Sequence, residues 1–431
     1  MTSDQDHRQG SFFDLLHQKW GRVFAILCLA QFALLVTLLA RWSSQKLPPP
    51  PAGTPPTFYT ATNREPYFAG QSGPWGDLEY IRINLELPDK FVADEQAVGP
   101  TRWFFAGATR EQLQELFISC GLTEVQYSEL RDKGTWATES DGILITPPGD
   151  LVLNLSQKSR AALYSVLGAN KRNDFQMSPF VYRQGGFDDW FKDSGLSEAT
   201  LQLVKKVVYR RGAAVCVSDL PELSARVADP AERWRLVKTL SRASSLLMKL
   251  RIRPDSDIKA LTAYWARGWH VKDIESLLES LTRVPGGVTV DVAHLMPPFA
   301  RKRMNSYPTP LAPGQRAPDC YWTALNFFND PPDDRYFDDA IWRKELKEQC
   351  QLVEQPTFGD LVFLVRQDGV PVHCAVFVAD DVVFTKNGAN MRQPWKLMKM
   401  EDMLARYPAD IPLRVVFFRR DGTTQPTPEV K

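Results

Sequence analysis

Two residues in the last third of the chain have the types that cleave amide bonds when they meet. Cys320 follows Asp319 at the start of a predicted helix, and His373 opens a predicted strand. The free backbone N–H groups and the positive dipole end of a helix favour a thiolate over a thiol. An imidazole can activate that thiol and later protonate the leaving amine. We therefore take Cys320 as a candidate nucleophile and His373 as its candidate general base.

The cysteines of this region also have structural interpretations. Cys374 alternates away from His373 along the same strand, and Cys350 ends a charged, helix-like stretch. For Cys320 the structural alternative is a buried core cysteine, which is common for this residue type. In an exported domain two of these cysteines could instead form a disulfide, and the sequence does not select a pair.

A short helix and an antiparallel meander must position the candidate pair. Apolar residues recur at helical spacing from Tyr321 to Phe328 and predict a buried helix. Residues 361–364 favour a strand, and a hairpin signal at 367–369 connects it to a strand that starts near His373. In the expected architecture this helix packs on the sheet, so that Cys320 and His373 are able to face each other.

Alternation assigns faces to the predicted strands. His373 shares a face with Ala375 and Phe377, and Cys374 lies on the other face. An acidic turn at 380–381 leads to a third strand, and residues 413–418 offer a fourth. On the third strand one face carries Val383, Thr385 and Asn387.

The order of these motifs resembles the NlpC-type branch of papain-like cysteine peptidases. The resemblance rests on Asp319-Cys320 at a helix start, the Gly359–Phe363 segment before a strand, and His373 followed by alternating apolar residues. It covers roughly residues 301–425. It implies a papain-like half-barrel in which a cysteine attacks an amide, typically in bacterial cell-wall peptides.

The resemblance also implies roles for further residues. The residue that orients the histidine falls near Thr385, where the family commonly has a histidine, and Asn387 is the alternative on the same strand face. Tyr307 lies where the family places an upstream tyrosine, beside an oxyanion hole to which the Cys320 N–H contributes. Tyr321-Trp322 replace the small Ser-Gly of the family, so they either shape the substrate cleft or fill core.

Three functions remain open from the sequence. The first is a membrane-anchored thiol hydrolase that cleaves amide bonds in cell-wall peptides through Cys320 and His373. The second is a catalytically silent papain-like domain that binds cell-wall peptide or a partner protein. The third is an amide-transferring enzyme that uses the same cysteine chemistry.

A membrane anchor is predicted near the N-terminus. No charged residue interrupts the apolar segment 23–40, which as a helix would span about 27 Å, roughly one hydrocarbon core. The basic residues flanking it favour a cytoplasmic N-terminus, with the bulk of the chain outside the cytoplasm at an inner or plasma membrane. The Pro-rich run 48–56 favours a stiff spacer. A cleaved signal peptide and a buried soluble helix are the alternatives.

The expected class is α+β, with one membrane helix and two folded regions. The folded regions are a helix-rich middle region of unknown role (58–300) and an NlpC-like domain (301–425). In the middle region, a capping-box pair Thr109/Gln112 and an Asp229-Pro230 helix start predict helices, and residues 81–87 predict a strand. The remaining segments are a tail (1–22), the anchor (23–40), a linker (41–57) and a C-terminal tail (426–431).

Composition limits the partners. The 52 basic and 51 acidic residues give a net charge of +1, so no electrostatic footprint for nucleic acid is present. The chain has no phosphate-binding, dinucleotide or H-E-x-x-H motif, and its six cysteines contain no C-x-x-C pair, so we expect neither a cofactor nor a metal. The expected partners are a peptide or peptidoglycan and the membrane, while the oligomeric state stays open.

Overall fold

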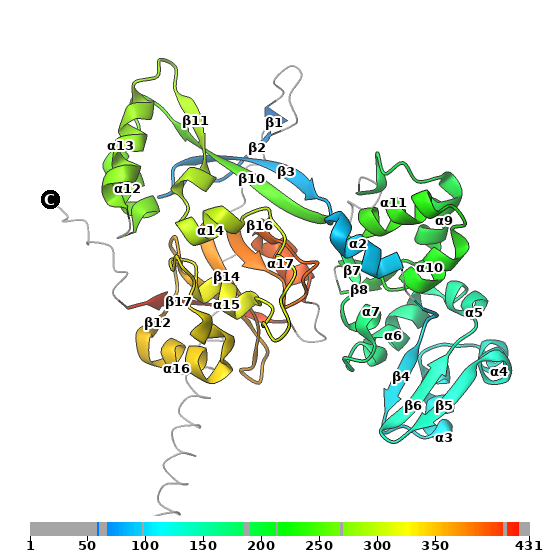
Figure 1. Ribbon diagram of the computed structural model, residues 1–431. Helices are drawn as coiled ribbons and strands as arrows, with labels where there is room; N and C mark the ends of the chain where they lie inside the picture. The colour runs from blue at the N-terminus through cyan, green and yellow to red at the C-terminus, as the bar shows by residue number, and fades with distance from the viewer. Residues whose placement is uncertain are drawn as a thin grey trace, which may run out of the picture. The chain divides into compact units, whose positions relative to one another are not determined.

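The computed structural model describes residues 58–59, 67–96, 99–183, 190–212, 214–267, 270–407 and 412–421 (Figure 1). Within these ranges helices accompany several antiparallel sheets, which confirms the α+β class. The expected tail, anchor and linker (1–57) and the C-terminal tail lie outside the described residues. In the part of the chain that is described, no helix is both long and apolar enough to span a membrane.

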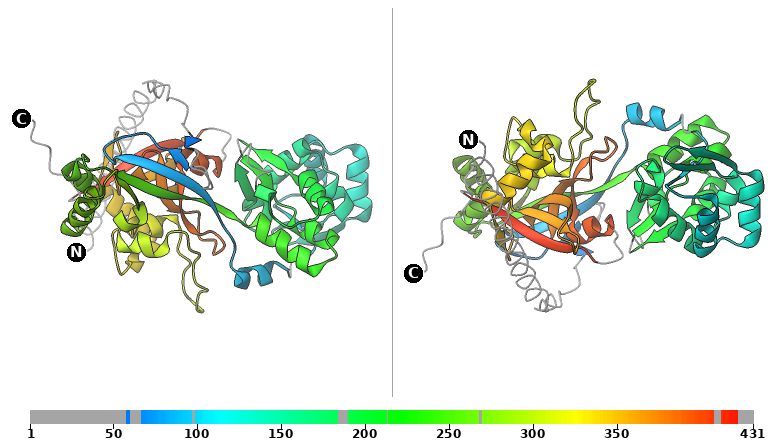
Figure 2. Two further views of the ribbon diagram at one scale, coloured as in Figure 1. Left: turned by 90° about the horizontal axis from the view of Figure 1, so that it is seen from above. Right: turned by 90° about the horizontal axis from the view of Figure 1, so that it is seen from below.

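A five-stranded antiparallel sheet contains the start of the described chain. Its central pair is β3 with β10, the long blue and green strands that lie side by side in Figure 2. They pair from Leu85 opposite Ala243 to Asp77 opposite Arg251. The strand expected at 81–87 is thereby confirmed, although it starts earlier and ends at Leu85. In spatial order the strands are β1 (Phe58–Tyr59), β2 (Tyr67–Ala69), β3 (Asp77–Leu85), β10 (Ala243–Ile252) and β11 (Val288–Asp291).

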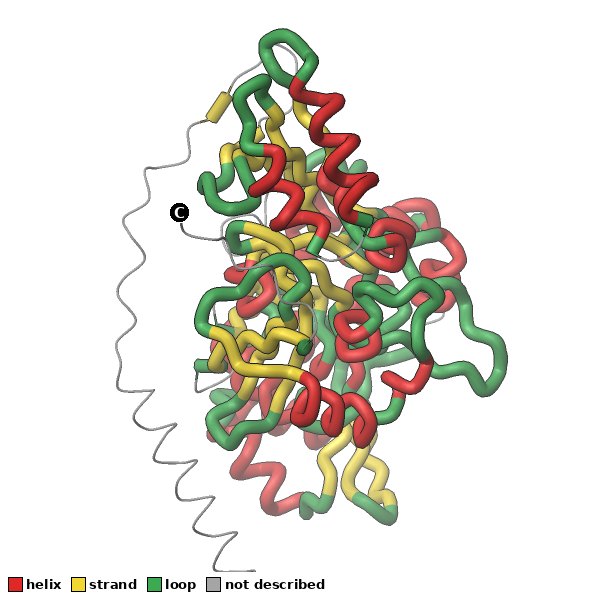
Figure 3. Tube along the Cα trace, turned by 90° about the vertical axis from the view of Figure 1, so that its left-hand side faces the viewer, coloured by secondary structure: helices red, strands yellow, loops and turns green. Residues whose placement is uncertain are grey.

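Helices α12 and α13 follow β10 and lie side by side at the top of Figure 3. Their apolar faces contribute Trp265 and Leu278 to the main core. The helices around this sheet are α12 (Ile258–Ala266), α13 (Val271–Thr282), the 3-10 helix η1 (Val292–Leu295) and α14 (Pro298–Arg303).

The chain between β3 and β10 forms two three-stranded sheets with helices around them. The helix expected after Thr109 is confirmed, because Thr109 and Gln112 form a reciprocal capping box, and the helix expected after Asp229 starts at Pro230. The strands are β4 (Trp103–Ala106), β5 (Thr135–Glu139), β6 (Gly142–Thr146), β7 (Phe180–Arg183), β8 (Tyr209–Arg211) and β9 (Ala214–Val217), in the orders β4-β6-β5 and β7-β9-β8. The helices are α2 (Asp89–Gln96), α3 (Arg110–Ser119), α4 (Glu124–Lys133), α5 (Gly149–Leu153), α6 (Gln157–Leu167), α7 (Asp174–Met177), α9 (Glu198–Val207), α10 (Leu220–Arg226) and α11 (Pro230–Leu240).

The C-terminal region is a six-stranded antiparallel sheet with the short helix α15 packed against β14 and β15. This confirms the expected helix on an antiparallel sheet, with two strands, β12 and β16, beyond the four predicted. In spatial order the strands are β12 (Cys350–Val353), β17 (Arg414–Arg420), β13 (Leu361–Val365), β14 (Pro371–Ala379), β15 (Val382–Lys386) and β16 (Trp395–Lys399). The helices are α15 (Cys320–Leu325), the 3-10 helix η2 (Asp334–Phe337), α16 (Asp339–Gln349) and α17 (Met400–Ala405).

One hydrophobic cluster contains residues from both sides of the expected boundary at residue 300. Trp265 packs on Phe358 with ring centroids 5.4 Å apart, and the Tyr264 hydroxyl donates to the Val378 carbonyl at 2.8 Å. Next to them, the buried Asp360 carboxylate pairs with Arg267 at 2.6 Å. The strands β3, β10 and β11 and the helices α12 and α13 therefore share a core with the C-terminal sheet, whereas most of the chain between β3 and β10 packs in other clusters.

Candidate functional site

Cys320 is the first residue of α15, as the sequence predicted, but its side chain is only 5% exposed. The Asp319 carboxylate caps the helix by accepting from the Trp322 N–H at 2.8 Å. Burial raises the pKa of the Cys320 thiol to about 12, and the neighbouring Asp319 contributes in the same direction. Backbone N–H groups of Cys374, Cys320 and Tyr321 lower this pKa, but less strongly than burial raises it.

His373 is fully buried, and both of its ring nitrogens have partners within the fold. Nε2 lies 2.8 Å from Thr385 Oγ1, and Nδ1 lies 2.8 Å from the Tyr407 hydroxyl. The Tyr407 ring also stacks on the imidazole, with centroids 4.5 Å apart. Burial lowers the pKa of His373 to about 3, and the nearby Arg406 and Lys396 cations add to this shift.

The hydrogen bonds around His373 form a chain that ends at Asn387. The Tyr407 hydroxyl donates to Asn387 Oδ1 at 3.3 Å. The Asn387 oxygen can only accept, so the Tyr407 hydroxyl gives its proton to Asn387 and must accept from His373 Nδ1–H. In that tautomer Nε2 carries no proton and accepts from the Thr385 hydroxyl. Asn387 Nδ2 is buried and has no hydrogen-bond partner among the described residues. The structure thus brings His373, Thr385 and Asn387 together, as the sequence suggested, and adds Tyr407.

The helix α15, which begins at Cys320, packs on the face of the C-terminal sheet opposite to the face that carries His373. On the face covered by α15, Cys374 and Val376 pack in one cluster with Trp322. Ala375 and Phe377, which alternate with them and share the face of His373, pack in a separate cluster with Met403. Among the described residues, no hydrogen bond joins Cys320 Sγ to the imidazole, and the two ring nitrogens bond Thr385 and Tyr407. The thiol of Cys320 instead lies beside the backbone N–H of Cys374, the residue next to His373.

Lys386, rather than His373, is the basic side chain on the Cys320 side of the sheet. Its Nζ donates to the carbonyls of Gly388 and Asn390 at 2.7 and 2.9 Å. Burial lowers the pKa of Lys386 to about 8, against an opposing effect of Cys320 and Asp319. Alternation with Val382 and Phe384, both in the same cluster as Trp322, would have pointed to this residue in the sequence.

Two of the aromatic residues expected near the substrate contribute to the core. Trp322 is 5% exposed, stacks on Phe337 with centroids 5.4 Å apart, and donates to Asp334 at 3.2 Å. Tyr321 stacks on Trp342 with centroids 4.3 Å apart, and its hydroxyl donates to the Pro371 carbonyl at 3.1 Å. For this Tyr-Trp pair the core-filling alternative matches the packing.

Tyr307 does not contact Cys320. Its hydroxyl donates to the Leu85 carbonyl at 3.1 Å, and its ring packs with the cluster that contains Phe91 and Leu240. The oxyanion or substrate role that the resemblance implied for Tyr307 has no geometric support at this position.

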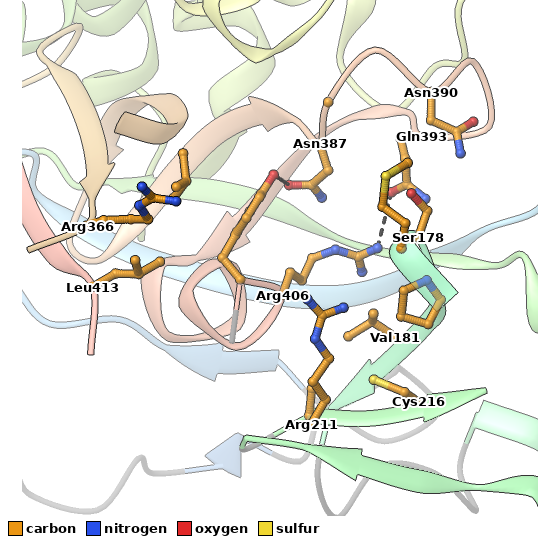
Figure 4. Close-up of a pocket in the computed structure, with 16 residues that line it drawn as sticks. Ser178, Val181, Arg211, Cys216, Arg366, Asn387, Asn390, Gln393, Arg406 and Leu413 are labelled. Carbon is orange, nitrogen blue, oxygen red and sulfur yellow. Dashed lines mark hydrogen bonds between the residues drawn. The ribbon is translucent and has the colours of Figure 1, made fainter. Parts of the chain in front are cut away.

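A cleft of about 400 Å³ opens on the His373 side of the sheet (Figure 4). Asn387, just after β15, and Tyr407, just after α17, line it from the C-terminal region, and Arg211 and Val181 line it from the β7-β9-β8 sheet. Arg406, which follows α17, also reaches into it. Sequence reasoning missed this cleft because its two walls are far apart along the chain.

Comparison with known protein families, with curated proteins and with solved structures finds no match for this chain.

Proposed function

We propose that this chain is a peptide-binding protein whose C-terminal domain is catalytically silent. The observation that carries the proposal is the burial of His373, whose ring has no exposed surface and a hydrogen-bond partner at each nitrogen. A general base must present a lone pair to the proton it removes. Because Thr385 and Tyr407 occupy both nitrogens, this imidazole is suited to holding a network together rather than to accepting a proton from a thiol.

The acid–base properties support the same proposal. Burial raises the pKa of the Cys320 thiol and lowers that of His373, so burial opposes a proton transfer from the thiol to the imidazole. Papain-like catalysis needs the reverse arrangement, with a low thiol pKa beside an imidazole that takes the proton. The amide-transferring alternative uses the same thiolate and meets the same obstacle.

The cleft beside Tyr407 and Asn387 is the feature suited to binding. Tyr407 and Asn387 line the cleft, and behind them Thr385 and His373 continue the hydrogen-bond chain that holds Asn387 Oδ1. A volume of about 400 Å³ falls in the range of sites for small ligands and short peptides. The predicted anchor at 23–40 and the spacer at 48–56 would hold such a module near a membrane, where the resemblance suggests cell-wall peptide as the ligand.

Alkylation kinetics test the silent state of Cys320. The full-length protein is treated with iodoacetamide at pH 7, and labelling of each cysteine is followed by mass spectrometry. We expect Cys320 to react more than about 100-fold more slowly than glutathione, because burial keeps it a neutral thiol. Cys350, which is partly exposed, serves as the internal control. Labelling of Cys320 faster than glutathione would contradict the proposal and favour the thiol hydrolase.

A further inference from the structure

The cleft beside Tyr407 is one part of a longer groove. Residues 177–178, Asn387, Gly388 and Asn390 line both this cleft and a neighbouring hollow of about 710 Å³. The neighbouring hollow continues toward Pro310 and Leu311. A ligand in the cleft can therefore extend along the 387–391 loop, as a short peptide would.

Arg406 supplies a cation to the cleft, and among the described residues no carboxylate lies within ion-pair distance of it. Its guanidinium donates to Gln393 Oε1 at 3.2 Å and, within the described residues, takes part in no ion pair (Figure 4). The nearby Asp402 pairs with Arg82 at 2.9 Å and acts on Arg406 only through space, as the weakest of the electrostatic influences on its pKa. Burial lowers the pKa of Arg406, which shows that its surroundings penalise an uncompensated charge. An anion in the cleft would remove this penalty.

Arg211 brings a second guanidinium from the opposite wall. In the described part of the chain it too has no ion-pair partner, and Figure 4 draws it beside Arg406 and Cys216. Both arginines lower the pKa of the Cys216 thiol, which places both cations close to that sulfur. Burial nevertheless raises this pKa to about 11, so the thiol is neutral and does not balance them. None of the described residues that line the cleft is acidic.

Asn387 adds a neutral donor without a partner. The residue is 9% exposed, and its Nδ2 is a buried donor that no described acceptor satisfies. Its Oδ1 accepts from the Tyr407 hydroxyl, which leaves the amide nitrogen as the end without a described partner. A buried donor left without a partner costs about 1–3 kcal/mol, which an acceptor in the cleft would recover.

We propose that this cleft binds the free C-terminal carboxylate of a peptide through Arg211, Arg406 and Asn387. The inference rests on the proposed function and names the end of the peptide that is recognised. A guanidinium fork matches the planar carboxylate, and the Asn387 amide adds a third donor. Val181, Val372 and Leu413 line the same cleft and suit an apolar side chain near that carboxylate.

A pair of matched peptides tests the proposal. Acetyl-glycyl-alanyl-alanine with a free C-terminus and the same peptide as its C-terminal amide are titrated into the full-length protein by calorimetry. We expect the amide to bind at least 10-fold more weakly than the free acid. We also expect Arg406→Gln and Arg211→Gln each to weaken binding of the free acid at least 10-fold.

Arg210→Gln is the control variant. Arg210 is exposed on β8 next to Arg211, and by strand alternation its side chain lies on the other face, so binding should be unchanged. Urea unfolding of each variant separates lost binding from lost folding. An Arg406→Lys variant that folds normally and still loses affinity for the acid supports recognition by the guanidinium fork.

The remaining outcomes overturn carboxylate recognition, the peptide ligand or the binding function itself. Equal binding of the acid and the amide supports the peptide-binding function but overturns carboxylate recognition. Binding of inorganic phosphate without binding of either peptide makes the cleft a phosphate site and overturns the peptide ligand. Absence of binding by the acid, the amide and phosphate to a folded protein overturns the inference together with the proposed function.

Discussion

Lowering the pH should destabilise this protein through His373. The ring is sealed in the fold as a neutral imidazole, and in the unfolded chain it regains an ordinary pKa. Between pH 6.5 and about 3 the unfolded state therefore binds a proton that the native state does not. The free energy of unfolding must therefore fall as the pH drops through this window. The stabilisation that comes from keeping His373 neutral is fully present only above about pH 6.5.

The magnitude follows from the two pKa values. A shift from 6.5 to about 3 corresponds to roughly 5 kcal/mol in total, at about 1.36 kcal/mol per pKa unit. Between pH 7 and pH 5 the expected loss from this one residue is about 2 kcal/mol. Lys386, with a pKa of about 8, titrates above this interval and does not contribute to it.

Urea unfolding at pH 7 and pH 5 measures this loss, with His373→Gln as the matched variant. The Gln side chain has no proton to gain in this range, so its unfolding free energy should fall by about 2 kcal/mol less than that of the wild type. Subtracting the two proteins cancels other groups with shifted pKa values, such as Lys396 and Asp319. Equal pH dependence in both proteins would mean that the imidazole titrates normally in the native state and that burial does not keep it neutral.

Two further substitutions test the core and the network. Asp360→Asn should lower the free energy of unfolding in urea by about 3–5 kcal/mol, because Arg267 and Arg419 would lose the buried carboxylate that they share. A loss below about 1 kcal/mol would contradict the close packing of Arg267 on the C-terminal sheet. Tyr407→Phe should lower the free energy of unfolding by about 1–3 kcal/mol in the same assay, since His373 Nδ1 and Asn387 Oδ1 would lose their common partner. Wild-type stability in this variant would show that the Tyr407 hydroxyl does not link His373 to Asn387.

Local signals in the sequence predicted much of the secondary structure. The capping box at Thr109, the Asp229 helix start, the helix at Cys320 and the strand at His373 all depend on neighbours within a few residues. Such signals survive in the fold because caps and alternation are satisfied locally. The strand at Trp395–Lys399 escaped prediction because Lys396 interrupts its apolar pattern, although that lysine is 1% exposed in the structure.

Residue types and order along the chain by themselves determined that a cysteine starts a helix and that a histidine, a threonine and an asparagine share one side of a sheet. Only the tertiary structure decided that α15 covers the other side, and that the His373 ring bonds Thr385 and Tyr407. It also decided that Arg211 and Arg406, nearly two hundred positions apart, reach one cleft without a carboxylate between them. The pKa values of the cysteine, the histidine and the arginines depend on burial and on neighbours that are distant in sequence. Neither burial nor such neighbours can be obtained from spacing along the chain.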